Sequence, residues 1–249
     1  MRNEPAILTY HAIGTVSRGE PLHSAFVPAA AFEAQMGFLA RRREVVSLEQ
    51  AAAGAAGVAI TFDDAYESVL TDAVPVLRRL GLPAAIFVPT KWIGDRNRWD
   101  AAQTPLSVMT GDQLAELDAD GFEIASHGHA HIDLGRADAA TAREDIEASA
   151  RTLEDLLGAR PRHFAYPFGS SSPQARDAVA AAGFEAGFGL GRGFGRMALE
   201  RVTVHPSDGS RLFALKTSSR YVPWRRSRPA RAADAVAGSL ARRRRRWTR

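Results

Sequence analysis

Cysteine is absent from the 249 residues of this chain. The protein therefore has no disulfide framework and no thiolate metal site. Any metal ion would have to be held by histidine, aspartate or glutamate side chains. The lack of cysteine is compatible with every cellular compartment, so it does not by itself fix a location.

Long apolar segments are missing as well. No stretch reaches 18 uncharged apolar residues, so the sequence predicts no membrane-spanning helix. The opening MRNEPAILTYHAIG passes directly from polar residues into a strand-like segment, without the basic and apolar regions of a signal peptide. We therefore expect a cytoplasmic protein.

Lysine is nearly absent, since only Lys91 and Lys216 occur and almost all of the basic charge is arginine. The arginines are unevenly placed, because residues 220–249 contain eleven of them and a single acid, Asp234. The net charge of +4 thus conceals an acidic body and a strongly basic end.

This charge distribution predicts two parts. Residues 1–218 are expected to form one domain, and residues 219–249 an Arg-rich, flexible tail. The tail could contact anionic lipid headgroups, with Trp247 at the membrane interface, as a peripheral membrane attachment. Nucleic acid is not expected as a partner, and the oligomeric state is not predicted.

Short apolar segments alternate with helix-like segments along most of the chain. Periodicity and end signals predict helices over 110–121, 138–158 and 173–183, and another begun by Pro28. This order favours parallel strands joined by right-handed crossovers, in a closed or nearly closed βα barrel. A doubly wound open sheet is the alternative, but no glycine-rich phosphate loop follows the first strand. The expected strands are 6–10, 58–62, 84–89, 122–126, 163–167, 185–190 and 201–204.

Polar or unusual residues follow four of these strands. Catalytic residues of parallel α/β folds collect where strands end and loops begin, so these residues should meet at one mouth. They are His11 after 6–10, Asp63 and Asp64 after 58–62, His127, His129 and His131 after 122–126, and Tyr166, Pro167 and Phe168 at the end of 163–167.

The aspartate pair alone has two interpretations. Adjacent carboxylates repel each other unless a cation or a shared proton lies between them, but Asp is also common in turns and helix caps. The nearby histidines favour a cation between the carboxylates over a simple turn or helix cap. Two imidazoles spaced H-x-x-x-H in a loop, beside a carboxylate, are typical of a catalytic zinc site with open positions.

The motifs LTYH, TFDD, SHGHAH and FAYPFG, in this order, resemble those of the polysaccharide deacetylase family, carbohydrate esterase family 4. The resemblance extends from about residue 5 to 215 and is strongest for a subgroup with an N-terminal YH strand. It implies a single-domain α/β fold, a distorted (β/α)7 barrel, with a divalent metal, most often Zn²⁺. It also implies hydrolysis of N-acetyl groups on amino sugars, with a carbohydrate substrate.

The resemblance assigns the metal ligands and the base. It implies that Asp64, His127 and His131 bind the metal ion and that Asp63 is the catalytic base. His129, which lies between the two histidine ligands, receives no role.

The resemblance also implies a general acid and an oxyanion donor. His11 matches the general acid, with His205 as the rival for that role. The backbone N–H of Phe168 matches the oxyanion donor.

Two positions depart from the family pattern. Ala165 stands where many members carry an arginine that orients the base, and Arg160, Arg162 and Arg201 are the candidates to replace it. Surface salt bridges are nevertheless the simpler expectation for Arg201 and His205. Ala65 replaces the usual glycine after the aspartates, which would be accommodated if its φ stays negative.

Substrate contacts are expected from Trp99, Tyr166 and Pro167. Trp92 is expected to pack beneath its own loop instead. The predicted function is a metal-dependent deacetylase that acts on N-acetylated sugars in an oligosaccharide, polysaccharide or glycolipid precursor. A hydrolase of non-sugar amides or imides and a non-catalytic binding module remain the alternatives.

Overall fold

The computed structural model describes residues 4–14, 26–99, 105–191 and 195–226. Its centre is a parallel sheet in the order β10-β1-β4-β5-β6-β7-β8-β9. A separate parallel pair consists of β2 (Ala12–Ile13) and β3 (Phe26–Val27). The strands of the main sheet are β1 (Ala6–Tyr10), β4 (Val58–Phe62), β5 (Ala85–Val88), β6 (Glu123–Ser126), β7 (His163–Ala165), β8 (Ala186–Gly189), β9 (Leu199–Glu200) and β10 (Val202–Thr203).

The two edges of this sheet are joined by one extended segment. Strands β9 and β10 are separated only by Arg201; β9 pairs with β8, and β10 pairs with β1. The N–H of Arg201 donates to the carbonyl of Gly189 at 2.9 Å, so the segment changes partner at this residue. The sheet is thereby nearly closed into a barrel. With β9 and β10 counted as one position it has seven strands, which confirms the predicted fold class.

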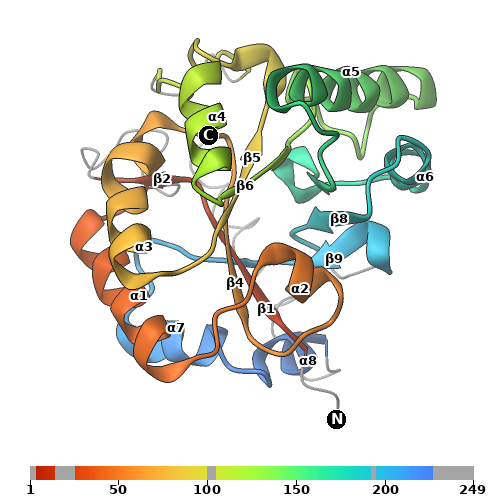
Figure 1. Ribbon diagram of the computed structural model, residues 1–249. Helices are drawn as coiled ribbons and strands as arrows, with labels where there is room; N and C mark the ends of the chain where they lie inside the picture. Colours follow the sequence, from red (N-terminus) through yellow and green to blue (C-terminus); the bar gives the residue numbers. More distant parts are fainter. Residues whose placement is uncertain (1–3, 15–25, 100–104, 192–194, 227–249) are drawn as a thin grey trace, which may run out of the picture.

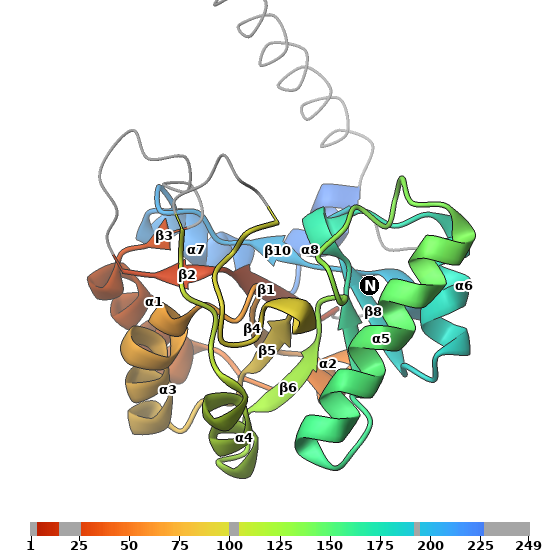
Figure 2. The ribbon, with the colours of Figure 1, turned by 90° about the horizontal axis from the view of Figure 1, so that it is seen from above.

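Helices surround the strands, and Figures 1 and 2 show α1, α3, α4, α5 and α6 on the outside of the barrel. The π-helical turn η1 leads into α3, and η2, η3 and η4 are single 3₁₀ turns. The helical elements are α1 (Ala29–Arg42), α2 (Leu48–Ala52), η1 (Val69–Ala73), α3 (Val74–Leu80), η2 (Thr90–Trp92), α4 (Gly111–Ala119), α5 (Ala139–Leu157), η3 (Pro167–Gly169), α6 (Pro173–Ala181), η4 (Arg196–Ala198), α7 (Ser210–Lys216) and α8 (Tyr221–Arg226).

The predicted helix ends agree with the structure. Thr110 and Gln113 form the capping box at the start of α4, and α5 ends at Gly158, whose φ is 75°. Both signals act through nearby backbone groups, which is why the sequence alone reveals them.

Strand residues alternate between the barrel interior and the helices, as a pleated backbone requires. Phe87 and Phe188 belong to an alanine-rich interior cluster that also contains Ala59 and Ala165. Residues at the alternate positions, such as Ile60, instead join the side chains of α1, α3 and α4. This alternation also decides which residues at the strand ends face the mouth.

Part of the predicted tail is helical. Residues 221–226 form α8, and Val222 in this helix is buried. The remainder of the predicted tail, with Trp247, lies outside the described residues, so the domain boundary at residue 218 stays a prediction. Among the helices of the described residues, none combines the length and hydropathy that a membrane span requires.

Candidate metal centre

The aspartate pair lies in a strained turn at the end of β4. The N–H of Asp63 still donates to the carbonyl of Tyr10 at 2.9 Å and so extends the β1–β4 ladder. The backbone then turns left-handed, with φ of 71° at Asp64 and 48° at Ala65. The condition of a negative φ, under which Ala65 would be accommodated without strain, is therefore not met. An L-residue in this conformation costs roughly 1–2 kcal/mol, which surrounding contacts must offset.

Such strain is concentrated in this region. The other two non-glycine residues with positive φ in the described ranges are His131 and Phe168, at 59° and 58°. All four residues follow the carboxyl ends of β4, β6 or β7. Strained backbone gathered at one mouth is characteristic of a functional site.

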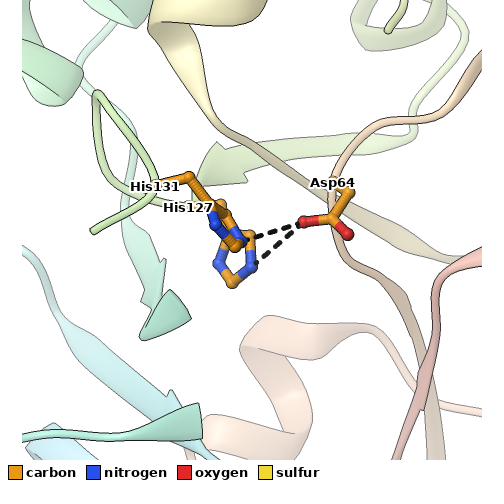
Figure 3. Close-up of side chains that lie close together, drawn as sticks. All are labelled: Asp64, His127 and His131. Atoms are coloured by element: carbon orange, nitrogen blue, oxygen red, sulfur yellow. Dashed lines mark ion pairs between the residues drawn. The ribbon is translucent and has the colours of Figure 1, made fainter. Parts of the chain in front are cut away.

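The three predicted metal ligands converge on one another (Figure 3). Asp64 Oδ1 lies 3.2 Å from Nε2 of His131 and 3.6 Å from Nε2 of His127. One candidate ligand atom from each residue lies within 4.8 Å of the other two, and all three side chains are buried. Two segments more than 60 residues apart in the sequence thus supply two nitrogen donors and one oxygen donor to a single point.

The hydrogen bonds around this cluster leave a nitrogen lone pair and a carboxylate oxygen free to bind a cation. His127 Nδ1 lies 2.8 Å from the carbonyl oxygen of Ala165, which can only accept, so Nδ1 carries the proton and the lone pair of Nε2 faces Asp64. Asp64 Oδ1 is buried and lacks a hydrogen-bond donor within the described residues. A buried oxygen and a nitrogen lone pair directed at one point are unfavourable without a positive charge between them. The residues present therefore fit a divalent metal ion.

The pKa shifts agree with this arrangement. Burial lowers the pKa of His127 to about 4, although the charge of Asp63 opposes the shift, so its imidazole is neutral at physiological pH. Burial raises the pKa of Asp64, but His131 and its neighbouring histidines lower it more, and the pKa lies well below its usual range. A neutral imidazole and an ionised carboxylate are the forms that bind metal.

Asp63 is held by Arg201 in the barrel interior. The guanidinium donates from Nη1 to Oδ1 at 2.6 Å and from Nη2 to Oδ2 at 2.8 Å, and both residues are buried. Burial raises the pKa of Asp63, but the charge of Arg201 and then that of His127 outweigh it, so the pKa is lower than usual. The expected surface salt bridge of Arg201 was wrong, because its side chain is fully enclosed.

The other two candidate arginines lie elsewhere. Arg160 pairs with the helix residues Glu147 and Glu154, and Arg162 pairs with Glu49 and Glu185 at the surface. Of the three candidates, Arg201 is the one that contacts Asp63.

The remaining histidines occupy distinct places. His11, between β1 and β2, has Nε2 4.0 Å from Asp63 Oδ2 and a side chain that is 27% exposed. His205 is exposed, and its backbone N–H donates to the carboxylate of Asp208. His129 Nδ1 lies 2.9 Å from the hydroxyl of Thr90, outside the metal cluster. Within the part of the chain that the structure describes, His11 and His127 are thus the histidines whose ring nitrogens lie within 4.0 Å of Asp63.

Two aromatic rings flank His131. The ring centroids of Trp99 and Phe168 lie 4.6 Å and 4.8 Å from the imidazole centroid, and Phe168 is 56% exposed. Trp92 is partly buried against the core, and its indole nitrogen donates to the carbonyl of Ala130 at 3.3 Å.

Tyr166 and Pro167, which were expected to contact a substrate, are both buried. Strand alternation places Tyr166 on the same face as Phe164, under α5 and α6, and its hydroxyl donates to the carbonyl of Met197 at 2.6 Å. No sequence pattern indicated Asp145 of α5, whose carboxylate accepts hydrogen bonds from the loop between the predicted ligands His127 and His131.

The chain is similar in sequence to known polysaccharide deacetylases. Protein YxkH of Bacillus subtilis (strain 168), a polysaccharide deacetylase by name, is 27% identical over 221 residues, which cover 83% of this chain and 74% of that protein. A poly-beta-1,6-N-acetyl-D-glucosamine N-deacetylase of Staphylococcus aureus (strain MRSA252) is 27% identical over 140 residues, 53% of this chain and 47% of the relative. The match thus spans about half the length of the staphylococcal protein.

Solved structures share the fold. Streptococcus pyogenes deacetylase PplD in complex with acetate superposes with a TM-score of 0.74 at 21% identity, over 86% of this chain and 98% of that chain. IcaB from Ammonifex degensii gives a TM-score of 0.72 at 23% identity, over 86% and 97%. The family model described as polysaccharide deacetylase matches residues 51–187, from the helix before β4 to β8. The chain therefore belongs to the polysaccharide deacetylase family of hydrolases.

Proposed function

We propose that this protein is a metal-dependent hydrolase that removes N-acetyl groups from amino sugars in an oligosaccharide, polysaccharide or glycolipid precursor. The observation that carries the proposal is the convergence of Asp64, His127 and His131 beside Asp63, which Arg201 holds in place. The staphylococcal relative is named for a polymer of N-acetylglucosamine. Oligomers of that sugar are therefore the first substrates to test.

In this proposal Asp64, His127 and His131 hold the metal ion. Two imidazole nitrogens and one carboxylate oxygen favour Zn²⁺, which binds catalytic sites of this composition and leaves open positions. When bound, a divalent cation supplies Lewis-acid assistance to water and to the amide carbonyl.

The neighbouring residues move protons and stabilise charge. Asp63 is ionised because of Arg201, and it accepts a proton from the water that attacks the acetyl carbon. The backbone N–H of Phe168 donates to the carbonyl oxygen as negative charge develops there, a contribution of about 3 kcal/mol. His11 then protonates the leaving nitrogen, so the products are acetate and a free amine.

Trp99 and Phe168 are proposed to contact the sugar ring. Both rings lie next to His131, and Phe168 is exposed at the mouth. An aromatic face offers the apolar contact area that a pyranose ring needs beside its hydroxyl groups.

We also propose peripheral contact with an anionic membrane. Leu212 and Leu215 on α7 and Trp224 on α8 are exposed apolar side chains, and residues 227–249 that follow are rich in arginine. This combination suits an interface of acyl chains and anionic headgroups. The protein should sediment with phosphatidylglycerol vesicles, and Trp224→Ala should weaken that binding. Equal binding to phosphatidylcholine vesicles would contradict the proposal.

The central test measures metal content and acetate release for three forms of the protein. The wild type should bind one divalent ion and release acetate from N-acetylglucosamine oligomers. Asp63→Asn should retain the metal and lose turnover, whereas Asp64→Ala should lose both. Faster hydrolysis of cyclic imides than of the oligomers would favour the non-sugar alternative. A wild type that binds no metal would favour a binding module.

A further inference from the structure

The loop between the two proposed histidine ligands, residues 128–130, is fixed by hydrogen bonds from η2, α5 and the end of β6. On one side, η2 binds its carbonyl groups. The backbone N–H groups of Thr90 and Lys91 donate to the carbonyls of Gly128 and His129 at 3.1 Å and 2.9 Å. The indole N–H of Trp92 adds a bond to the carbonyl of Ala130, so all three loop carbonyls have donors.

On the other side, a carboxylate of α5 binds the loop amides. Asp145 Oδ2 accepts from the N–H of His129 at 2.9 Å, and Oδ1 accepts from the N–H of Ala130 at 2.7 Å. The N–H of Gly128 donates to the hydroxyl of Ser126, which in turn donates to Ser149 on α5. Every peptide group of the loop is therefore hydrogen-bonded, and one buried side chain supplies two of the six contacts.

Gly128 makes this carboxylate contact possible. Its φ is 76°, and a Cβ atom at this position would lie 2.6 Å from Asp145 Oδ2. The loop ends at His131, which also has positive φ. Local preference does not favour such a turn, so contacts from outside the loop must stabilise it.

On the basis of the proposed metal centre, we propose that Asp145 is a positioning residue that sets the metal affinity of this protein. It lies in the helix behind the loop, and its hydrogen bonds are to the backbone that carries His127 and His131. Hydrogen bonds to an ionised carboxylate are roughly twice as strong as neutral ones. Two of them on adjacent amides fix the separation and direction of the two imidazoles before the metal binds.

The variant Asp145→Asn tests this role with little change in volume. Its amide retains one acceptor oxygen, but the NH₂ group faces a backbone N–H and leaves that donor unpaired. We expect the dissociation constant for Zn²⁺, measured by chelator competition, to rise about 10–100-fold. The visible absorption spectrum of the Co²⁺-loaded protein should change as well, because it reports the arrangement of the ligands.

Asp138→Ala is the matched control. Asp138 also accepts two backbone N–H groups, those of Ala140 and Thr141, but at the exposed start of the same helix. Its loss should lower the melting temperature without altering Zn²⁺ affinity or the Co²⁺ spectrum. If Asp145→Asn does not fold, Gly128→Ala displaces the same carboxylate and should weaken Zn²⁺ binding in the same way.

The outcomes separate this role from the proposed function. Weaker binding in Asp145→Asn with unchanged binding in Asp138→Ala supports the positioning role. Wild-type affinity in folded Asp145→Asn, or an equal loss in both variants, overturns the role and leaves the deacetylase proposal intact. A wild type that binds neither Zn²⁺ nor Co²⁺ overturns both.

Discussion

The pairing of Arg201 with Asp63 places a positive charge beside the proposed base from the junction of β9 and β10. Ala165 occupies the position where the family resemblance places a base-orienting arginine, and it faces the barrel interior. Arg201 reaches the same interior from the junction of β9 and β10 and contacts both carboxylate oxygens. The positive charge beside the proposed base is thus retained, although it comes from the junction of β9 and β10 and not from β7.

Arg201→Gln should shift the pH dependence of catalysis. Without the guanidinium, burial dominates and the pKa of Asp63 rises. As the pH falls, the variant's base therefore becomes protonated at a higher pH than the wild-type base does. The acidic limb of the kcat/KM profile should therefore move to higher pH. Arg201→Lys retains a charge and should shift the limb less. An acidic limb unchanged in Arg201→Gln would show that Arg201 does not set the ionisation of the base.

His127 should make the metal-free protein less stable in mild acid. Its folded pKa of about 4 lies below the ordinary value of 6.5, so the unfolded chain binds the proton more readily. The contribution of neutral His127 to the free energy of unfolding is fully present above pH 6.5 and is lost as the pH falls toward 4. The free energy of unfolding should therefore decrease by about 2 kcal/mol between pH 8 and pH 5. Urea unfolding at several pH values measures this slope, and His127→Gln should flatten it. An equal slope in both proteins would contradict the assignment.

At the scale of single elements, helix ends were predictable because they depend on neighbouring residues. The Thr110 hydroxyl accepts the N–H of Gln113 at 3.2 Å, and the Gln113 side chain accepts the N–H of Thr110 at 2.8 Å. Several short elements that lie between the predicted ones, such as β9, α2 and α3, were missed. Such short elements carry too little periodicity to identify them and depend on the packing around them.

Thr110→Ala should therefore lower the free energy of unfolding by about 1 kcal/mol, because α4 loses a cap. Thr110→Ser keeps the hydroxyl and should remain near the wild-type value. Chemical denaturation of the three proteins provides the comparison, and Zn²⁺ affinity should be equal in all of them. A Ser variant as unstable as the Ala variant would mean that the cap does not stabilise α4.

At the scale of the whole molecule, the candidate centre connects two strands of the barrel that are not adjacent in the sheet. Asp64 follows β4, the two histidines follow β6, and β5 lies between these strands. Saturation with Zn²⁺ should stabilise the folded state, by about 2.7 kcal/mol at a hundredfold excess over the dissociation constant. Thermal unfolding with and without a chelator measures the effect, and Asp64→Ala should abolish it. A chelator-insensitive wild type would argue against the centre.

The sequence by itself determined the positions of the main strands and the chemically active residues that follow them. Alternating apolar segments located the main strands, and the order of Asp63, Asp64, His127 and His131 behind strand ends indicated a common mouth. Parallel topology requires such ends to meet, so these residues could be grouped without coordinates.

Only the tertiary structure decided the rest. It placed Arg201, and neither Arg160 nor Arg162, beside Asp63. It also directed the side chain of Tyr166 away from the barrel interior, beneath α5 and α6, and brought Asp145 of α5 to the loop of residues 128–130. These contacts join residues as far as 138 positions apart, and each depends on the strand face or helix face that carries the side chain. Residue type alone does not specify which face of a strand or helix points toward the site. The closure of the barrel and the packing of α5 determine that face.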